Sequence, residues 1–293
     1  MGHHGYMTLS CVRGHPEGRR PHQATASPAP ASSPAPGRRC ADPADECVLD
    51  TVAAVLAVKH LGDAKSRLVA TMSDEQATDL LSTTQRERLR ADPGALVLAM
   101  LTDTVDTLHR AGVRDVVVVT PDDRVRARAQ HLSAHVVDEP GDVAGGLNAA
   151  YALGAATART LWPAHRWVLM VQADLPAAEP SSLREIIDSA AGRGESMVTD
   201  RAGTGTSLLI RPTSSGELPH FGPDSAVAHR LAGVVELDPA HLRWPDIRTD
   251  VDTVSDLVAA LRLGVGEHTR SVLSDLTVCD AATSGVGDRP DAS

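Results

Sequence analysis

The sequence predicts an α/β fold in which helices cover both faces of a mostly parallel β-sheet, giving three layers. Short apolar runs alternate along the chain with longer amphipathic segments, as strands and helices do in such sheets. The chain has 293 residues, enough for one sizeable domain or two small ones. Hydrophobic residues make up 42% of it but aromatic residues only 2%, so the core must be aliphatic.

The first half of the folded region predicts three strands and three helices. The run Val52–Val58 is continuously apolar, as expected of a strand buried on both faces of a sheet. The segment Ala95–Arg110 is amphipathic and is followed by Gly112, a residue type that often ends helices. The remaining elements are strands at Val116–Thr120 and His135–Asp138 and helices at Asp122–His131 and Gly146–Leu161.

The second half continues the alternation. The strand predicted at Trp167–Gln172 is strongly apolar and ends shortly before Asp174. Further strands are predicted at Ser196–Thr199, Ser207–Ile210 and Val234–Leu237, and helices at 180–192, Ser225–Leu231 and 253–264. In sheets of this kind ligands bind beyond the carboxyl ends of the strands, so functional residues are expected in the segments that follow them.

Both ends of the chain lack the periodicity of secondary structure. Residues 1–47 are predicted to be a disordered extension, rich in Ala, Ser and Pro, and residues 274–293 a disordered tail. This leaves residues 48–273 for the folded domain. The extension has no continuous apolar segment of a secretory signal, so we expect a cytoplasmic protein. The cysteines all lie in these two end segments, as expected in a reducing compartment: Cys11, Cys40, Cys47 and Cys279.

Charge and motif content argue against several classes of function. The formal net charge of −10 disfavours binding to nucleic acid or to an anionic membrane surface. No apolar run approaches the roughly 20 residues that span a bilayer. The glycine-rich fingerprint of dinucleotide-binding domains and the P-loop of many ATPases are both missing from the sequence. A nucleotide would have to be held by other residues.

The segment after the first predicted strand carries both lysines of the chain. Lys59 and Lys65 lie close together with Arg67 beside them, whereas every other member of the 28 Lys and Arg is an arginine. A compact ammonium group makes different contacts from a planar guanidinium. Lysine at these two positions therefore suggests that an ammonium group is required there. Three cations at the carboxyl end of a strand suit a triphosphate, although a solvated loop with clustered lysines would give the same pattern.

Carboxylates follow two other predicted elements. Asp174 lies just beyond the strand Trp167–Gln172, where α/β nucleotide enzymes commonly hold Mg²⁺ through oxygen ligands. Asp250 and Asp252 are two residues apart in an extended segment, which predicts that one faces a metal ion while the other caps the following helix. Turn formation and helix capping are the alternative roles for all three.

Two further segments suit anion binding. Residues 200–207 combine glycines, which allow close backbone approach, with hydroxyl donors such as Thr206. The segment Phe221–Ser225 opens a short helix, and its N-terminal amides together with the Ser225 hydroxyl form a plausible seat for a phosphate or carboxylate. Plain turn geometry and capping by Asp224 or Ser225 are the alternatives.

Taken in order, these segments resemble the guanylyltransferase family of deazaflavin coenzyme (F-420) biosynthesis, which acts on phosphoenolpyruvate or 2-phospho-L-lactate. The resemblance spans residues 52–272 and is strongest for the actinobacterial members. The segments that carry it are Ala57–Lys59, Ala64–Leu68, Val97–Leu101, Val118–Asp122, Gly146–Asn148, Gln172–Pro176, Asp200–Thr206, Phe221–Ser225 and Asp250–Thr253. The family implies a single domain of the nucleotide-diphospho-sugar transferase (GT-A-like) type.

The resemblance also implies roles for individual residues. The positions that match phosphoenolpyruvate-binding residues are Thr206, Gly222 and Ser225. The positions that match Mg²⁺-binding carboxylates are Asp174, Asp250 and Asp252. The positions expected to hold the GTP phosphates are Lys59, Lys65 and Arg67, and those expected near the base and ribose are Asp122 and Asn148.

The reaction implied is in-line transfer of GMP from GTP to phosphoenolpyruvate, with pyrophosphate leaving and the product passing to a downstream transferase. Asp174 with Mg²⁺, Lys65 and Arg67 would stabilise the charge that develops, and no histidine or cysteine is needed as acid or base. 2-Phospho-L-lactate and 3-phosphoglycerate are alternative acceptors, because they differ little in shape. A nucleotidyltransferase acting on a molybdopterin or a sugar phosphate, or a nucleotide-binding regulatory protein, also remains open.

Overall fold

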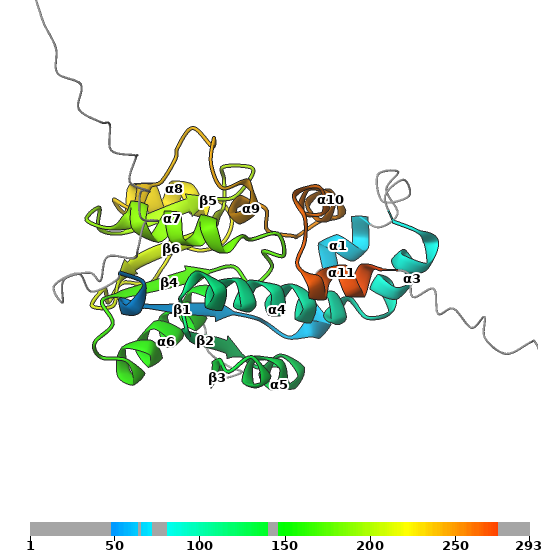
Figure 1. Ribbon diagram of the computed structural model, residues 1–293, viewed down its shortest axis with the longest axis horizontal. Coiled ribbons are helices and arrows are strands. Elements are labelled where there is room, and N and C mark those ends of the chain that lie inside the picture. The colour runs from blue at the N-terminus through cyan, green and yellow to red at the C-terminus, as the bar shows by residue number, and fades with distance from the viewer. Residues whose placement is uncertain (1–47, 64–65, 72–80, 140–145, 275–293) are drawn as a thin grey trace, which may run out of the picture. The chain divides into compact units, whose positions relative to one another are not determined.

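The computed structural model describes residues 48–63, 66–71, 81–139 and 146–274, which form a seven-stranded sheet covered by helices (Figure 1). The strands lie in the order β3-β2-β1-β4-β6-β5-β7. Their bounds are β1 Val52–Ala57, β2 Asp115–Thr120, β3 His135–Asp138, β4 Trp167–Val171, β5 Ser196–Thr199, β6 Thr206–Pro212 and β7 Val235–Glu236. Only β6 runs antiparallel to its neighbours, β4 and β5, so the prediction of a mostly parallel sheet is confirmed.

The helices follow the predicted alternation closely. The longer ones are α3 Thr83–Ala91, α4 Pro93–Ala111, α5 Asp123–His131, α6 Gly146–Leu161, α7 Pro180–Ala190 and α10 Val254–Leu263. The shorter ones are α1 Ser66–Thr71, α8 Ser225–Leu231, α9 Pro245–Arg248 and α11 Glu267–Leu273, with single 3₁₀ turns at Val48–Thr51 and Leu61–Asp63. No helix in the described part of the chain has the length and apolarity needed to cross a membrane.

Strand β1 lies at the centre of the core and is buried from Val52 to Leu56. Successive side chains face opposite sides of the sheet: Ala53 and Val55 join the cluster under α6, and Ala54 and Leu56 join the larger cluster under α4. On the α6 side, a Cβ at Gly154 would lie 2.3 Å from Cγ1 of Val55. Glycine therefore lets the long Ala-rich helix lie directly on the sheet.

Four helices were not predicted: the short α9, and three others that lie together. Helix α3 begins with a reciprocal capping box between Ser82 and Gln85, a local signal in a stretch whose polarity hid the helix. Helix α11 is attached to α4 by Asp103, whose buried carboxylate accepts the N–H groups of His268 (3.0 Å) and Thr269 (2.8 Å). The third, α1, follows the loop after β1. These helices gather with α10 beyond the carboxyl end of β1 (Figure 1).

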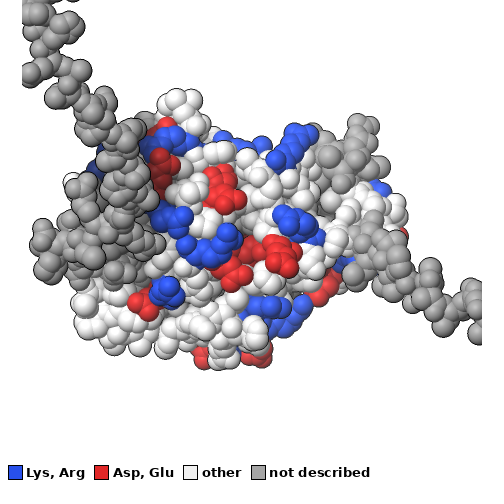
Figure 2. Space-filling view, in the orientation of Figure 1, with Lys and Arg blue, Asp and Glu red and all other residues white. Residues whose placement is uncertain are grey.

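The surface agrees with the acidic composition. On the face shown in Figure 2, basic and acidic side chains are interspersed, and blue and red groups lie next to one another. Mixed charge of this kind is unlike the continuous basic stripe that tracks a nucleic acid backbone. Of the predicted end segments, 1–47 and 274–293, only Ser274 at the end of α11 is among the described residues.

Candidate active site

A cavity of about 570 Å³ opens at the carboxyl ends of β1 and β4. Its walls come from the ends of these two strands, the turn between β5 and β6, the start of α8 and the segment before α10. The predicted site residues that line it are Lys59, Asp174, Thr206, Gly222, Ser225, Asp250 and Asp252. Segments up to about 190 residues apart in sequence thus meet at the sheet edge where ligands bind in such folds.

Some predicted residues do not belong to this lining. Asp122 caps α5 by accepting the N–H of Arg124 at 2.9 Å, and its other oxygen accepts the N–H of Leu61 at 3.0 Å. This geometry favours a structural role for Asp122 over the predicted contact with the nucleotide. Lys65 and the side chain of Arg67 lie outside the described residues, so their contacts with the triphosphate stay predictions.

Asn148 is also absent from the cavity lining and binds a neighbouring loop instead. Its Nδ2 donates to the carbonyl of Phe221 at 2.9 Å, and its Oδ1 accepts the N–H of the same residue at 2.7 Å. The amide therefore fixes the backbone immediately before Gly222, which has a φ of +131° and lines the cavity. The geometry favours a positioning role for Asn148 in the loop expected to bind the acceptor, rather than the predicted contact with base or ribose.

One wall of the cavity carries a pair of hydroxyl groups. Thr206 begins β6 and Ser225 begins α8, and their oxygens lie 3.0 Å apart. The N–H of Ala226 donates to the carbonyl of Thr204 at 3.0 Å, which attaches α8 to the β5–β6 turn. Neither alternative of helix capping holds: Asp224 makes no capping bond with its side chain, and the Ser225 hydroxyl is directed to Thr206.

Carboxylates line another part of the cavity. The N–H of Val251 donates to the carbonyl of Asp174 at 3.1 Å, which holds the two acidic segments together. Both Asp250 and Asp252 line the cavity, and neither is the N-cap of the next helix, so the prediction that one of them caps it is wrong. That cap is Thr253, whose hydroxyl accepts an N–H of α10.

The carboxylates of the cavity repel one another, which affects the pKa of Asp250. Burial, and then the negative charges of Asp174 and Asp252, raise the pKa of Asp250 to about 8. A cation in the cavity would relieve this repulsion, and carboxylate oxygens are the donors that Mg²⁺ prefers. No cluster of three or more His, Cys, Asp or Glu in the described residues could hold a metal ion by itself. This still fits Mg²⁺, which is commonly held by one or two carboxylates together with water and substrate phosphates.

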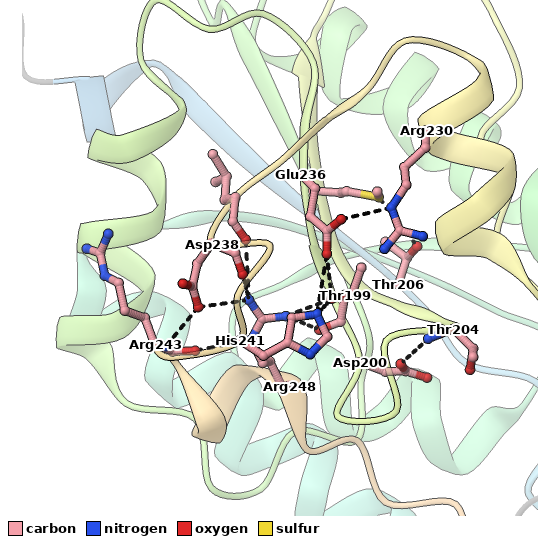
Figure 3. A network of polar contacts seen from close by, with 12 residues as sticks. Thr199, Asp200, Thr204, Thr206, Arg230, Glu236, Asp238, His241, Arg243 and Arg248 are labelled. Atoms are coloured by element: carbon pink, nitrogen blue, oxygen red, sulfur yellow. Dashed lines mark hydrogen bonds and ion pairs between the residues drawn. The ribbon is translucent and has the colours of Figure 1, made fainter. Parts of the chain in front are cut away.

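A buried arginine that the sequence analysis missed supports the acidic segment. Figure 3 shows the guanidinium of Arg248 among the oxygens of Thr199 and Asp238, at distances of 2.7–3.2 Å. Its own carbonyl accepts the N–H of Arg201 at 2.7 Å. Two residues before Asp250, Arg248 thus ties the carboxylate segment to the end of β5. Nothing in the local sequence distinguishes it from a surface arginine.

A domain-family model and several solved structures are similar to parts of this chain. The MobA-like NTP transferase domain model matches residues 98–236. A nucleotidyl transferase from Methanothermobacter thermautotroptrophicus is 20% identical, with 73% of this chain and 99% of that chain covered and a TM-score of 0.47. A putative nucleotide-diphospho-sugar transferase from Desulfovibrio desulfuricans is 15% identical, with coverages of 76% and 94% and a TM-score of 0.49.

Curated relatives are much closer in sequence. A phosphoenolpyruvate guanylyltransferase of Nocardia farcinica is 45% identical over 232 residues, covering 77% of this chain and 92% of the relative. A protein of the same name from Streptomyces scabiei is 40% identical over 230 residues, covering 76% of this chain and 96% of the relative. The matches run across nearly the whole of each relative. The chain therefore belongs to the phosphoenolpyruvate guanylyltransferase family.

Proposed function

We propose that this protein transfers GMP from GTP to the phosphate group of phosphoenolpyruvate and releases pyrophosphate. The observation that carries the proposal is the cavity at the carboxyl end of the sheet, which is lined both by the carboxylates Asp174, Asp250 and Asp252 and by the hydroxyl pair of Thr206 and Ser225. The names of the curated relatives point to the same substrates. The product would be consumed by a downstream transferase of deazaflavin coenzyme biosynthesis, in the cytoplasm.

The transfer needs positioning more than acid–base chemistry. A phosphate oxygen of the acceptor forms the new bond to the α-phosphorus of GTP, and the bond from that phosphorus to the bridging oxygen of pyrophosphate breaks. The attacking phosphate is already ionised at neutral pH, so no proton must be removed. The residues around the cavity then act by holding the two anions in line and by offsetting their charge.

The carboxylates and the hydroxyls of the cavity have different proposed roles, metal binding for the first and acceptor binding for the second. Asp174 and Asp250, with Asp252, would hold Mg²⁺, which supplies charge neutralisation at the reacting phosphates when bound. Lys59 lines the same cavity and would offset the charge of the nucleotide phosphates. The hydroxyls of Thr206 and Ser225 are suited to donate hydrogen bonds to the anionic acceptor.

Pyrophosphate release with GTP and Mg²⁺ tests the proposal directly. Phosphoenolpyruvate, 2-phospho-L-lactate and 3-phosphoglycerate are compared as acceptors, with ATP and CTP in place of GTP as controls. Release that requires both GTP and phosphoenolpyruvate supports the assignment. Asp174→Asn is expected to lower kcat by roughly 100-fold, the effect of losing one preorganised electrostatic contact. Release with another acceptor only, or with none, would reject phosphoenolpyruvate as the substrate.

A further inference from the structure

His229 lies directly behind the hydroxyl wall of the cavity. It is in α8, one helical turn after Ser225, and only 1% of its surface is exposed. The edge of its ring packs against Phe221, with ring centroids 5.5 Å apart. Phe221 in turn stacks on the buried ring of Tyr151 at 4.4 Å. The imidazole is therefore held in one orientation by packing, with its two nitrogens directed to fixed partners.

Those partners determine which ring nitrogen carries the proton. The backbone N–H of His220 donates to Nε2 at 3.0 Å, and since an amide N–H can only donate, Nε2 must be the acceptor. The proton of the neutral ring is then on Nδ1. Nδ1 lies 3.0 Å from Oγ1 of Thr206, so His229 donates to this hydroxyl.

The hydrogen bond from His229 determines whether the hydroxyl pair donates to a ligand or accepts from it. Thr206 and Ser225 bring two hydroxyl protons, and one of them is used in the 3.0 Å bond between the two oxygens. In this bond Ser225 donates to Oγ1 of Thr206, which also accepts from His229. The hydroxyl proton of Thr206 is therefore left to donate. The sulfur of Met197, 4.0 Å from Thr206 Oγ1, is only a weak acceptor for it. The hydroxyl pair is thereby oriented as a donor, which suits an anionic ligand.

The surroundings of His229 keep its ring neutral. Burial, followed by the charges of His220 and Arg211, lowers the pKa of His229 to about 4, although Glu195 and the backbone of Ser225 act in the opposite direction. A protonated ring would also turn Nε2 into a donor that faces the N–H of His220. The neutral donor geometry is therefore the stable one.

We propose that His229 is a positioning residue for the acceptor: it donates from Nδ1 to Thr206 and so orients the Thr206–Ser225 pair to bind an anionic group of the acceptor. The inference rests on the proposed function, because it assumes that this wall binds the phosphorylated acid. It gives the histidine no part in acid–base catalysis.

Two substitutions of similar polarity separate hydrogen bonding from packing. Asparagine can place an N–H near the position of Nδ1, whereas glutamine reaches the position of Nε2 and leaves Thr206 without its donor. We expect His229→Gln to raise the KM for phosphoenolpyruvate about tenfold, with the KM for GTP unchanged, and His229→Asn to stay within about twofold of wild type. If packing alone mattered, glutamine, which is nearer in size to histidine, would be the milder change. The opposite ranking, or equal effects on both substrates, would overturn the proposal.

A double variant tests whether His229 acts through Thr206. Thr206→Val removes the hydroxyl at nearly constant shape, so adding His229→Gln to it should raise the acceptor KM no further. Additive effects would mean that the histidine acts independently of this hydroxyl. His165→Gln is a control, because His165 pairs with Asp115 at 2.8 Å near the opposite end of the sheet and should leave both KM values unchanged.

The tautomer can be measured without any activity. In a ¹⁵N spectrum of the histidine side chains, the resonances of His229 are those that disappear in His229→Asn. We expect a protonated Nδ1 and an unprotonated Nε2, and addition of phosphoenolpyruvate should shift both signals. A protonated Nε2 would overturn the inference even in an active enzyme. Conversely, an inactive wild type with the expected tautomer and a shift on acceptor binding would reject the transfer reaction while leaving the positioning role supported.

Discussion

Replacing Asp250 with asparagine should make the metal-free protein more stable at alkaline pH while removing its activity. The carboxyl has a pKa of about 8 in the folded protein, against an ordinary value of 3.8. Between these values the folded state binds more protons than the unfolded state, so the free energy of unfolding falls as the pH rises. This carboxyl therefore opposes folding above about pH 4, because it ionises freely in the unfolded chain but not beside Asp174 and Asp252 in the folded protein.

The magnitude follows from the two pKa values. Between pH 6 and pH 8 the folded state retains most of the proton that the unfolded state has lost, which corresponds to a decrease of about 2 kcal/mol in the free energy of unfolding. For a domain of this size that is roughly 4–8 °C in Tm. Asparagine resembles the protonated carboxyl but cannot ionise, so Asp250→Asn should already be more stable than wild type at pH 6, and its advantage should be about 2 kcal/mol larger at pH 8.

The assay is thermal unfolding in the presence of EDTA at a series of pH values. Asp188→Asn, on the exposed face of α7, removes the same charge far from the cavity and should leave the difference from wild type independent of pH. Adding Mg²⁺ at pH 8 should raise the Tm of wild type more than that of Asp250→Asn. Wild-type and Asp250→Asn curves that stay parallel from pH 6 to pH 8 would refute the reasoning.

Three further substitutions test the supports of the site and the core. Arg248→Met should lower the free energy of unfolding by about 3–5 kcal/mol in denaturant titrations, because buried oxygens lose their charged donor; a loss below 1 kcal/mol would show that water replaces it. Asn148→Leu should raise the KM for the acceptor about tenfold more than the KM for GTP by releasing the Phe221 backbone, whereas a selective rise for GTP would restore Asn148 to the nucleotide site. Gly154→Ala should cost roughly 1–3 kcal/mol by crowding the sheet, while Gly62→Ala, in open space, should be tolerated; equal Tm values for the two would contradict the close packing.

Much of the fold was encoded locally, which is why the sequence predicted it. Apolar runs of strand length and amphipathic segments of helix length gave the order of elements, and Gly112 ends α4 in the left-handed conformation expected of a C-terminal glycine. The position of Asp174 just after β4 predicted its place in the cavity, because parallel strands bring their carboxyl ends to one edge. Helix α3 was missed although its capping box is local, because few of its residues are apolar.

The partners of the polar side chains were decided by the tertiary structure alone. Asn148 binds a backbone 73 residues away, and Asp250 shares a cavity with Asp174, which follows β4. The protonated nitrogen of His229 is set by one amide and one hydroxyl that the fold brings together. Periodicity reports whether a residue faces the core or the solvent, but a hydrogen bond depends on distance and direction between segments that are remote in sequence. The sequence thus predicted most of the residues that gather at the sheet edge, and the packing of the loops determined that Asn148 instead holds the backbone of a neighbouring loop.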